Sequence, residues 1–174
     1  MRHLRSVLLC AAVVQAMLAA APSLLRAQDM PPDLSGVWQG ILTNVPAHPG
    51  AAPVDVTMEI GALPADSGCA PWRTVYAEGG TVRQVKDYRL CRGLSAGELI
   101  IDEGDGTRLS ARWIGAVLVT PFKVGDVLLV SSIRLRGVLL EEEILTVQDR
   151  PAVQGVQPLV PRSIQRLVFR RRPI

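Results

Sequence analysis

The expected fold starts from the run Leu34-Ser35-Gly36-Val37-Trp38-Gln39-Gly40, which follows soon after an apolar N-terminal segment. Glycines stand two residues before and two residues after Trp38, and aliphatic runs continue beyond them. A Gly-x-Trp-x-Gly run that opens a β-rich domain directly after an export leader is typical of a small closed barrel. We therefore expect this run to start the barrel and to place Trp38 at one closed end of its core.

Short runs rich in Val, Ile, Leu and Thr recur along the rest of the chain, and turn residues such as Gly79-Gly80 separate them. This spacing, without a convincing amphipathic helix, predicts an all-β fold, and parallel pairing would need helical crossovers. The sequence predicts a single antiparallel meander β-barrel of about 8 to 10 strands, with a β-sandwich as the alternative. The expected strands cover residues 37–43, 54–60, 72–77, 82–90, 98–102, 108–114, 116–122, 127–136, 139–147 and 164–170.

Residues 1–27 have the pattern of a cleaved secretory signal peptide, with two arginines in Met1–Arg5 and an apolar stretch to Leu25. We expect cleavage after Ala27, because an apolar and a small residue stand where signal peptidase reads the chain. An uncleaved membrane anchor is the alternative, since about 20 apolar residues approach the spanning length. Pro22 and the alanine-rich end favour cleavage. The expected protein is exported, periplasmic or secreted, and the composition of the leader suggests a bacterium.

The remaining chain, residues 28–174, is expected to be one β-barrel domain with no further transmembrane segment. Residues 148–162 contain three prolines and are expected to form a loop, and residues 170–174 a basic tail. The full chain has 19 Lys and Arg against 16 Asp and Glu, and the leader removes three arginines, which leaves 16 against 16. A neutral body lacks the basic face that nucleic-acid binding needs. The tail is either solvated or in contact with an anionic surface.

Two cysteines remain after cleavage, Cys69 and Cys91, and an even number in an exported protein predicts a disulfide. If residues 72–77 and 82–90 form a hairpin that turns at residues 79–81, the numbers of two residues that face each other across it add up to 160. The numbers 69 and 91 also add up to 160, so the two cysteines are expected to face each other. The bridge would close a loop of about 20 residues and contribute roughly 3 kcal/mol. No metal site is expected, because His48 is the one histidine left and lies in a Pro/Gly/Ala loop.

Two short motifs resemble those of a known family. Gly36-Val37-Trp38 resembles the Gly-x-Trp signature that opens the first strand of lipocalins and their calycin relatives, and Lys86-Asp87-Tyr88 is similar to their Thr-Asp-Tyr motif. The resemblance implies that the tryptophan plugs one end of the barrel and that an arginine from a late strand, Arg166 or Arg170, packs over its ring. The opening run is also similar to that of nitrobindin-like haem barrels. The late haem-ligating histidine of those barrels has no counterpart here, so no haem or other cofactor is expected.

Arginines next to tryptophans are the candidate ligand-binding groups. In a strand, adjacent residues face opposite sides, so either the tryptophans lie in the core and the arginines in solvent, or an arginine enters the lumen and holds a carboxylate. The ligand-facing candidates are Arg112, Trp113, Arg134 and Arg136. The alternative for Arg134 and Arg136 is a charge ladder, with Arg136 facing Glu141 and Arg134 facing Glu143 on one sheet face.

Three functions follow from these features. The first is an exported barrel that binds a small apolar or amphipathic molecule in its lumen, which requires an internal cavity. The second is an interaction module whose barrel is filled by its own side chains. The third is an enzyme that uses two convergent carboxylates among Asp87, Asp102, Glu141 and Glu143. No catalytic residue is predicted from a nucleophile motif, because no Gly-x-Ser-x-Gly elbow occurs.

Overall fold

The computed structural model describes residues 32–47, 49–64 and 68–173, and every helix or strand in these ranges is a β-strand. The strands are β1 (Gly36–Val45), β2 (Val54–Ile60), β3 (Cys69–Glu78), β4 (Thr81–Arg92), β5 (Glu98–Asp102), β6 (Arg108–Ile114), β7 (Val117–Val124), β8 (Val127–Arg136), β9 (Leu139–Asp149) and β10 (Leu159–Arg171). The predicted leader, residues 1–27, lies outside the described residues. In the part of the chain that is described, no helix is long and apolar enough to cross a membrane.

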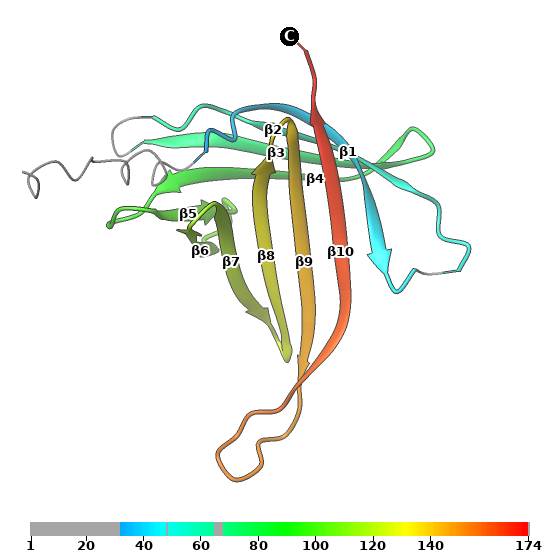
Figure 1. Cartoon of the computed structure of the whole chain (residues 1–174), viewed down its shortest axis with the longest axis vertical. Coiled ribbons are helices and arrows are strands. Elements are labelled where there is room, and N and C mark those ends of the chain that lie inside the picture. Colours follow the sequence, from blue (N-terminus) through cyan, green and yellow to red (C-terminus); the bar gives the residue numbers. More distant parts are fainter. Residues whose placement is uncertain (1–31, 48, 65–67, 174) are drawn as a thin grey trace, which may run out of the picture. The chain divides into compact units, whose positions relative to one another are not determined.

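The strands form a closed antiparallel barrel in chain order (Figure 1). Each strand pairs with its neighbours in the sequence, and β1 pairs with β10 to close the ring. This meander confirms the predicted all-β barrel, and the sandwich alternative is wrong. Strands β2, β5, β6 and β8 have the predicted bounds, and the others differ by a few residues. Because β9 and β10 extend further than expected, their connection is shorter than the expected loop and covers residues 150–158.

The core lies at the end of the barrel where β1 begins and β10 ends, which we call the Trp38 end. Side chains alternate between lumen and outer face along the strands, so each strand contributes every second residue to this core. The Trp38 indole Nε1 donates a hydrogen bond of 2.9 Å to the Leu34 carbonyl oxygen. The side chains of Trp38, Leu118, Leu140, Leu167 and Phe169 are at most 1% exposed. We call the opposite end the Gly79 end, after the β3–β4 turn.

The structure explains why glycine stands at both Gly36 and Gly40 of the opening run. Gly36 has a φ of +130°, a conformation that side chains disfavour. A Cβ on Gly40 would lie 2.4 Å from the Val168 carbonyl oxygen, because β1 approaches β10 closely there. The run therefore fixes how the first and last strands meet.

The arginine over the Trp38 ring is Arg171, whose guanidinium carbon lies 4.6 Å from the ring centroid. The expectation of Arg166 or Arg170 is wrong for a simple reason of register. Trp38 pairs with Arg171, whereas Arg166 is exposed and bonds Glu143. Arg170 and Arg171 belong to β10, so the basic end of the chain starts inside a strand.

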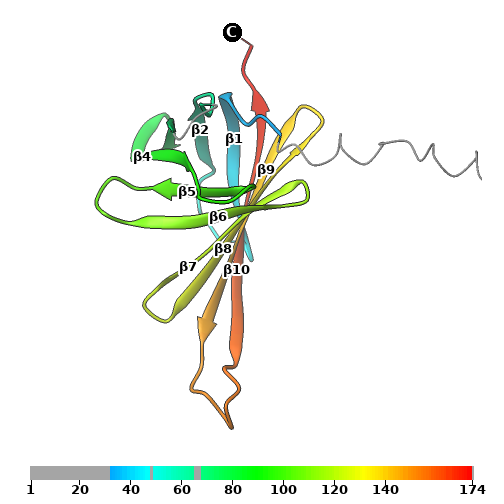
Figure 2. The same cartoon turned by 90° about the vertical axis from the view of Figure 1, so that its left-hand side faces the viewer.

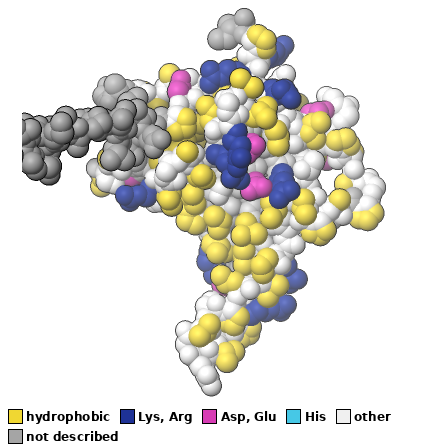
Figure 3. All heavy atoms as spheres, viewed as in Figure 1, with side chains coloured by type: hydrophobic (Ala, Val, Ile, Leu, Met, Phe, Trp, Pro, Cys, Tyr) yellow, Lys and Arg dark blue, Asp and Glu magenta, His cyan; other side chains and the backbone are white. Residues whose placement is uncertain are grey.

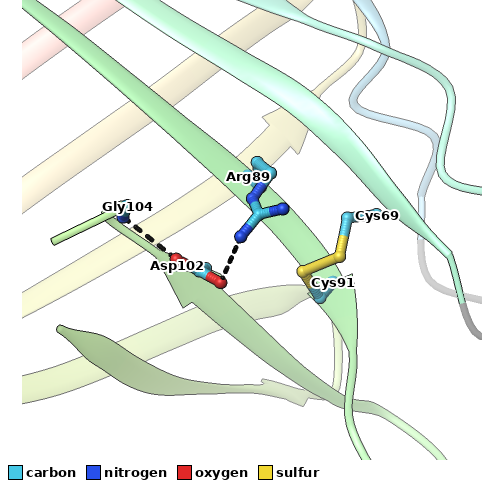
Figure 4. Close-up of a disulfide and its surroundings, with 5 residues drawn as sticks. All are labelled: Cys69, Arg89, Cys91, Asp102 and Gly104. Atoms are coloured by element: carbon cyan, nitrogen blue, oxygen red, sulfur yellow. Dashed lines mark hydrogen bonds and ion pairs between the residues drawn. A yellow bond between two sulfur atoms is a disulfide. The ribbon is translucent and has the colours of Figure 1, made fainter. Parts of the chain in front are cut away.

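Cys69 and Cys91 form the predicted disulfide between β3 and β4 (Figure 4). They face each other in the hairpin register, as the sequence arithmetic predicts. The register shifts between Tyr76 and Ala77, so the turn is the pair Gly79-Gly80, with φ angles of +52° and +77°. Two successive residues with positive φ are typical of the tight turn that matches strand twist.

On one side of the barrel, neighbouring strands pair over only a few residues. β5 pairs with β4 only over Arg89–Arg92, and β7 pairs with β6 only over Arg112–Ile114. Figure 2 shows β6 and β7 diverging from their shared turn. We call the interval between residues 81–88 of β4 and residues 120–124 of β7 the seam, because the short β5–β6 hairpin bridges it only near the Trp38 end. An ion pair of 2.8 Å from Arg89 Nη2 to Asp102 Oδ2 ties β4 to β5 beside it (Figure 4).

Candidate functional site: a cavity in the barrel lumen

A cavity of about 280 Å³ lies inside the barrel, between the core at the Trp38 end and the Gly79 end. Strands on both sides of the seam contribute to its wall. The lining residues are Met58, Trp72, Thr74, Tyr76, Lys86, Tyr88, Ile101, Glu103, Leu109, Thr120, Phe122, Ser131, Glu142 and Ile144. The barrel is therefore not filled by its own side chains.

The cavity wall combines an apolar part and a polar part. Trp72 is 5% exposed, and its Nε1 has no hydrogen-bond acceptor among the described residues. Other apolar lining side chains are Met58, Ile101, Leu109, Phe122 and Ile144. The polar lining side chains are Thr74, Tyr76, Lys86, Tyr88, Glu103, Thr120, Ser131 and Glu142. Such a wall suits a molecule with a hydrocarbon part and a polar group.

Glu142 is the buried acid of this wall and is 9% exposed. It is the middle residue of Glu141-Glu142-Glu143, and strand alternation turns it inward while its neighbours face outward. Ser131 Oγ, on the neighbouring strand β8, donates a hydrogen bond of 2.9 Å to Glu142 Oε1. A buried carboxyl with a polar neighbour inside a cavity is a group to which a ligand can form a hydrogen bond.

Burial sets the acidity of the groups around the cavity. Burial raises the pKa of Glu142, against the smaller lowering effects of the Ser131 hydrogen bond and the Lys86 charge. Burial and the nearby Glu142 charge raise the pKa of Tyr76 to about 12. Burial and Glu103 raise the pKa of Tyr88 as well. Both phenols are therefore neutral hydrogen-bond donors at physiological pH.

Lys86 is the cation of the cavity wall. Its Nζ lies 5.7 Å from the centroid of the Tyr76 ring and 6.0 Å from that of the Tyr88 ring. Among the described residues no acid lies within ion-pair distance of it. Tyrosine faces hold the ammonium in place without neutralising its charge.

The four sequence-predicted ligand residues do not line the cavity. Arg112 is exposed, and Trp113 is half-buried and packs against the core. Their alternation follows the arrangement with tryptophan inward and arginine in solvent. Ligand binding by Arg112, Trp113, Arg134 and Arg136 stays a prediction, whereas the cavity is built from other residues.

Arg134 and Arg136 belong to an ion-pair ladder on the outer face of β8, β9 and β10. Arg134 Nη2 lies 2.9 Å from Glu143 Oε2, and Arg136 Nε lies 2.9 Å from Glu141 Oε2. Arg166 extends the ladder with a 2.9 Å contact to Glu143 Oε1. Basic and acidic side chains lie side by side near the middle of the face in Figure 3. The Arg134–Glu143 and Arg136–Glu141 contacts are those of the ladder alternative and run diagonally, because Arg134 is registered with Glu141. Arg134 Nε also lies 3.4 Å from Glu141 Oε2, and Arg166 is registered with Glu143.

The acids of the enzyme hypothesis do not converge in the cavity. Asp87 pairs with Arg73 at 2.7 Å and Asp102 pairs with Arg89 at 2.8 Å, both outside the lumen. Glu141 and Glu143 belong to the ladder. The carboxylates that do line the cavity, Glu103 and Glu142, were not among the predicted ones.

A signal for the missed residues exists in the sequence. Lys86 and Tyr88 are two residues apart in a strand, so both face the same side, and the alternation that turns Asp87 outward turns them inward. By the same alternation, Glu142 faces the opposite side of its strand from Glu141 and Glu143. The sequence does not say which side faces the lumen, because exposed and lumenal polar residues look alike in it.

Comparisons with known proteins give a fold and no family. No family model matches the chain, and no curated protein matches it. Among solved structures, the chain is similar to the S-type phycobiliprotein lyase CPES from Guillardia theta, with a TM-score of 0.54 and 10% sequence identity. The match covers 81% of this chain and 89% of that one. The likeness extends over most of both chains, so this protein shares its overall fold with that lyase.

Proposed function

We propose that this protein is an exported barrel that binds a small amphipathic molecule in its lumen. The cavity carries the proposal: about 280 Å³ of space faces apolar side chains on one part of its wall and Lys86, Ser131 and Glu142 on another. Ligand sites are typically concave and mostly apolar with a few convergent polar groups. The alternative of a filled interaction barrel predicts no such space.

Two observations support export. The leader pattern of residues 1–27 precedes the barrel in the sequence. The Cys69–Cys91 disulfide fits an oxidising compartment, where such bonds persist. Amino-terminal sequencing of the protein purified from its own host tests the cleavage, and a chain that starts at Gln28 is the expected result.

The ligand test is native mass spectrometry of the mature protein from its own host, in which a co-purifying small molecule appears as an added mass. A lumen-filling variant, Ser131→Phe, is expected to lose the adduct because Ser131 lines the cavity. The matched control is Ser132→Phe, on the outer side of the same strand, which is expected to keep it. Circular dichroism establishes that both variants fold. Repeated absence of any adduct in the parent protein, or equal loss in both variants, would contradict the proposal.

A further inference from the structure

The polar part of the cavity has opposite charges on opposite walls. Lys86 enters from β4 and Glu142 from β9, and each lines the same space. The Lys86 charge acts on Glu142 through space, yet the two groups are not within ion-pair distance. Because both side chains line one cavity of about 280 Å³, a ligand group in that cavity can interact with both.

The chemistry of that group follows from what the two side chains offer. The Lys86 ammonium donates hydrogen bonds and accepts none. Glu142 is buried, which favours its neutral acid, and a neutral carboxylic acid also donates one hydrogen bond. A positively charged ligand group would meet Lys86 at close range and be repelled. The complementary group is an anionic acceptor with two oxygens.

We propose that the cavity binds organic carboxylates, with the ligand carboxylate between Lys86 Nζ and the Glu142 side chain and its hydrocarbon part against Trp72, Ile101 and Phe122. This inference rests on the proposed lumenal binding and names the ligand class. Charge-assisted hydrogen bonds to the ligand carboxylate supply the selectivity. The remaining charged or titratable lining groups are Tyr76 on β3, Tyr88 on β4 and Glu103, which follows β5.

The binding step is coupled to a proton. Where Glu142 is ionised in the free protein, the ligand carboxylate brings a second negative charge close to it, so Glu142 takes up one proton from solvent as the ligand binds. The bound state then holds one ammonium, one ligand carboxylate and one neutral acid, so charge and protons balance. Binding of carboxylates is expected to strengthen as pH falls from above the pKa of Glu142 towards it.

The experiment compares three probes of equal chain length, octanoate, octan-1-ol and octylamine, by isothermal titration calorimetry with the mature protein after any bound molecule is removed. Octanoate is expected to bind at least about tenfold more tightly than the alcohol or the amine. Titration in two buffers of different ionisation enthalpy measures the proton uptake. Equal affinity for the three probes, or tighter binding of octylamine, overturns the inference and leaves lumenal binding intact. Failure of all three probes to bind counts against both proposals.

Variants locate the effect. Lys86→Met is expected to remove the preference for octanoate, and Lys86→Arg to keep it. The control Lys123→Met removes a cation that pairs with Asp149 outside the cavity and is expected to change nothing. Glu142→Gln is expected to bind octanoate without proton uptake, because its amide N–H donates the same bond without titrating. An unchanged preference in Lys86→Met, or unchanged proton uptake in Glu142→Gln, overturns the assignment.

Discussion

Trp38 illustrates how one residue is placed by its strand and its register together. Leu167 and Phe169 of β10 are buried, and Arg171, exposed at the end of the strand, lies on the same face and is registered with Trp38. Arg166 and Arg170 have even numbers and face outward, so neither reaches the ring. The resemblance predicted an arginine of the last strand over the ring, and strand parity explains why this arginine is Arg171 and not Arg166 or Arg170.

Replacing Arg171 by Gln removes the guanidinium from the Trp38 ring and should lower the free energy of unfolding by about 1 kcal/mol. Urea denaturation followed by tryptophan fluorescence and circular dichroism measures the change. Arg170→Gln is the control, since Arg170 is exposed and registered with Gln39. A loss as large in the control as in Arg171→Gln would mean that net charge, and not the ring contact, is responsible.

Glu142 should make stability depend on pH. Its pKa in the folded protein lies above the ordinary value of 4.5 because of burial, so the folded state holds its proton more tightly than the unfolded state does. The stability that protonated Glu142 contributes is full below pH 4.5 and is lost as pH rises through the raised pKa.

Glu142→Gln abolishes this titration, so the variant should gain free energy of unfolding relative to the parent as pH rises from about 4 to about 8. Urea denaturation of both proteins across this range measures the difference. A difference that stays constant with pH would show that Glu142 ionises as easily in the folded chain as in the unfolded one.

The elements were largely predictable from the sequence, and the reason is local. Alternation and turn residues placed all of the strands, and the Cys69–Cys91 arithmetic gave the hairpin register. The extent of pairing was not predictable, because the short β4–β5 and β6–β7 contacts depend on how the barrel closes. The cavity was missed for a related reason. Local sequence does not reveal which face of Lys86-Asp87-Tyr88 turns inward.

The disulfide stabilises the β3–β4 hairpin across a sequence separation of 22 residues. A crosslink of this length is expected to contribute about 3 kcal/mol, chiefly by restricting the unfolded chain. Urea denaturation with and without a reductant measures this contribution in one chain. The double variant Cys69→Ala, Cys91→Ala should be less stable and indifferent to the reductant. A parent protein whose midpoint ignores the reductant contradicts the expectation, provided that thiol titration confirms reduction.

At the scale of the whole barrel, stability and site come from different regions. The buried hydrophobic side chains gather at the Trp38 end, and the cavity occupies the lumen beyond them. One part of the barrel can therefore hold the fold while another carries polar groups that cost stability, such as Glu142. The seam borders the cavity between residues 81–88 and 120–124, where the wall has the fewest pairings.

The pairing of β1 with β10 has a consequence for chain connectivity. The Arg172 backbone N–H donates a hydrogen bond of 2.8 Å to the Val37 carbonyl oxygen, so the two ends of the barrel domain are already neighbours. A circular permutant that joins Pro173 to Asp33 by a short Gly/Ser linker and opens the chain between Gly79 and Gly80 should fold to the same barrel. Circular dichroism and thermal unfolding would test it, and an unfolded product would contradict it. The strands form a closed ring, so the fold does not require the chain to start at β1, and other turns between strands can serve as chain ends.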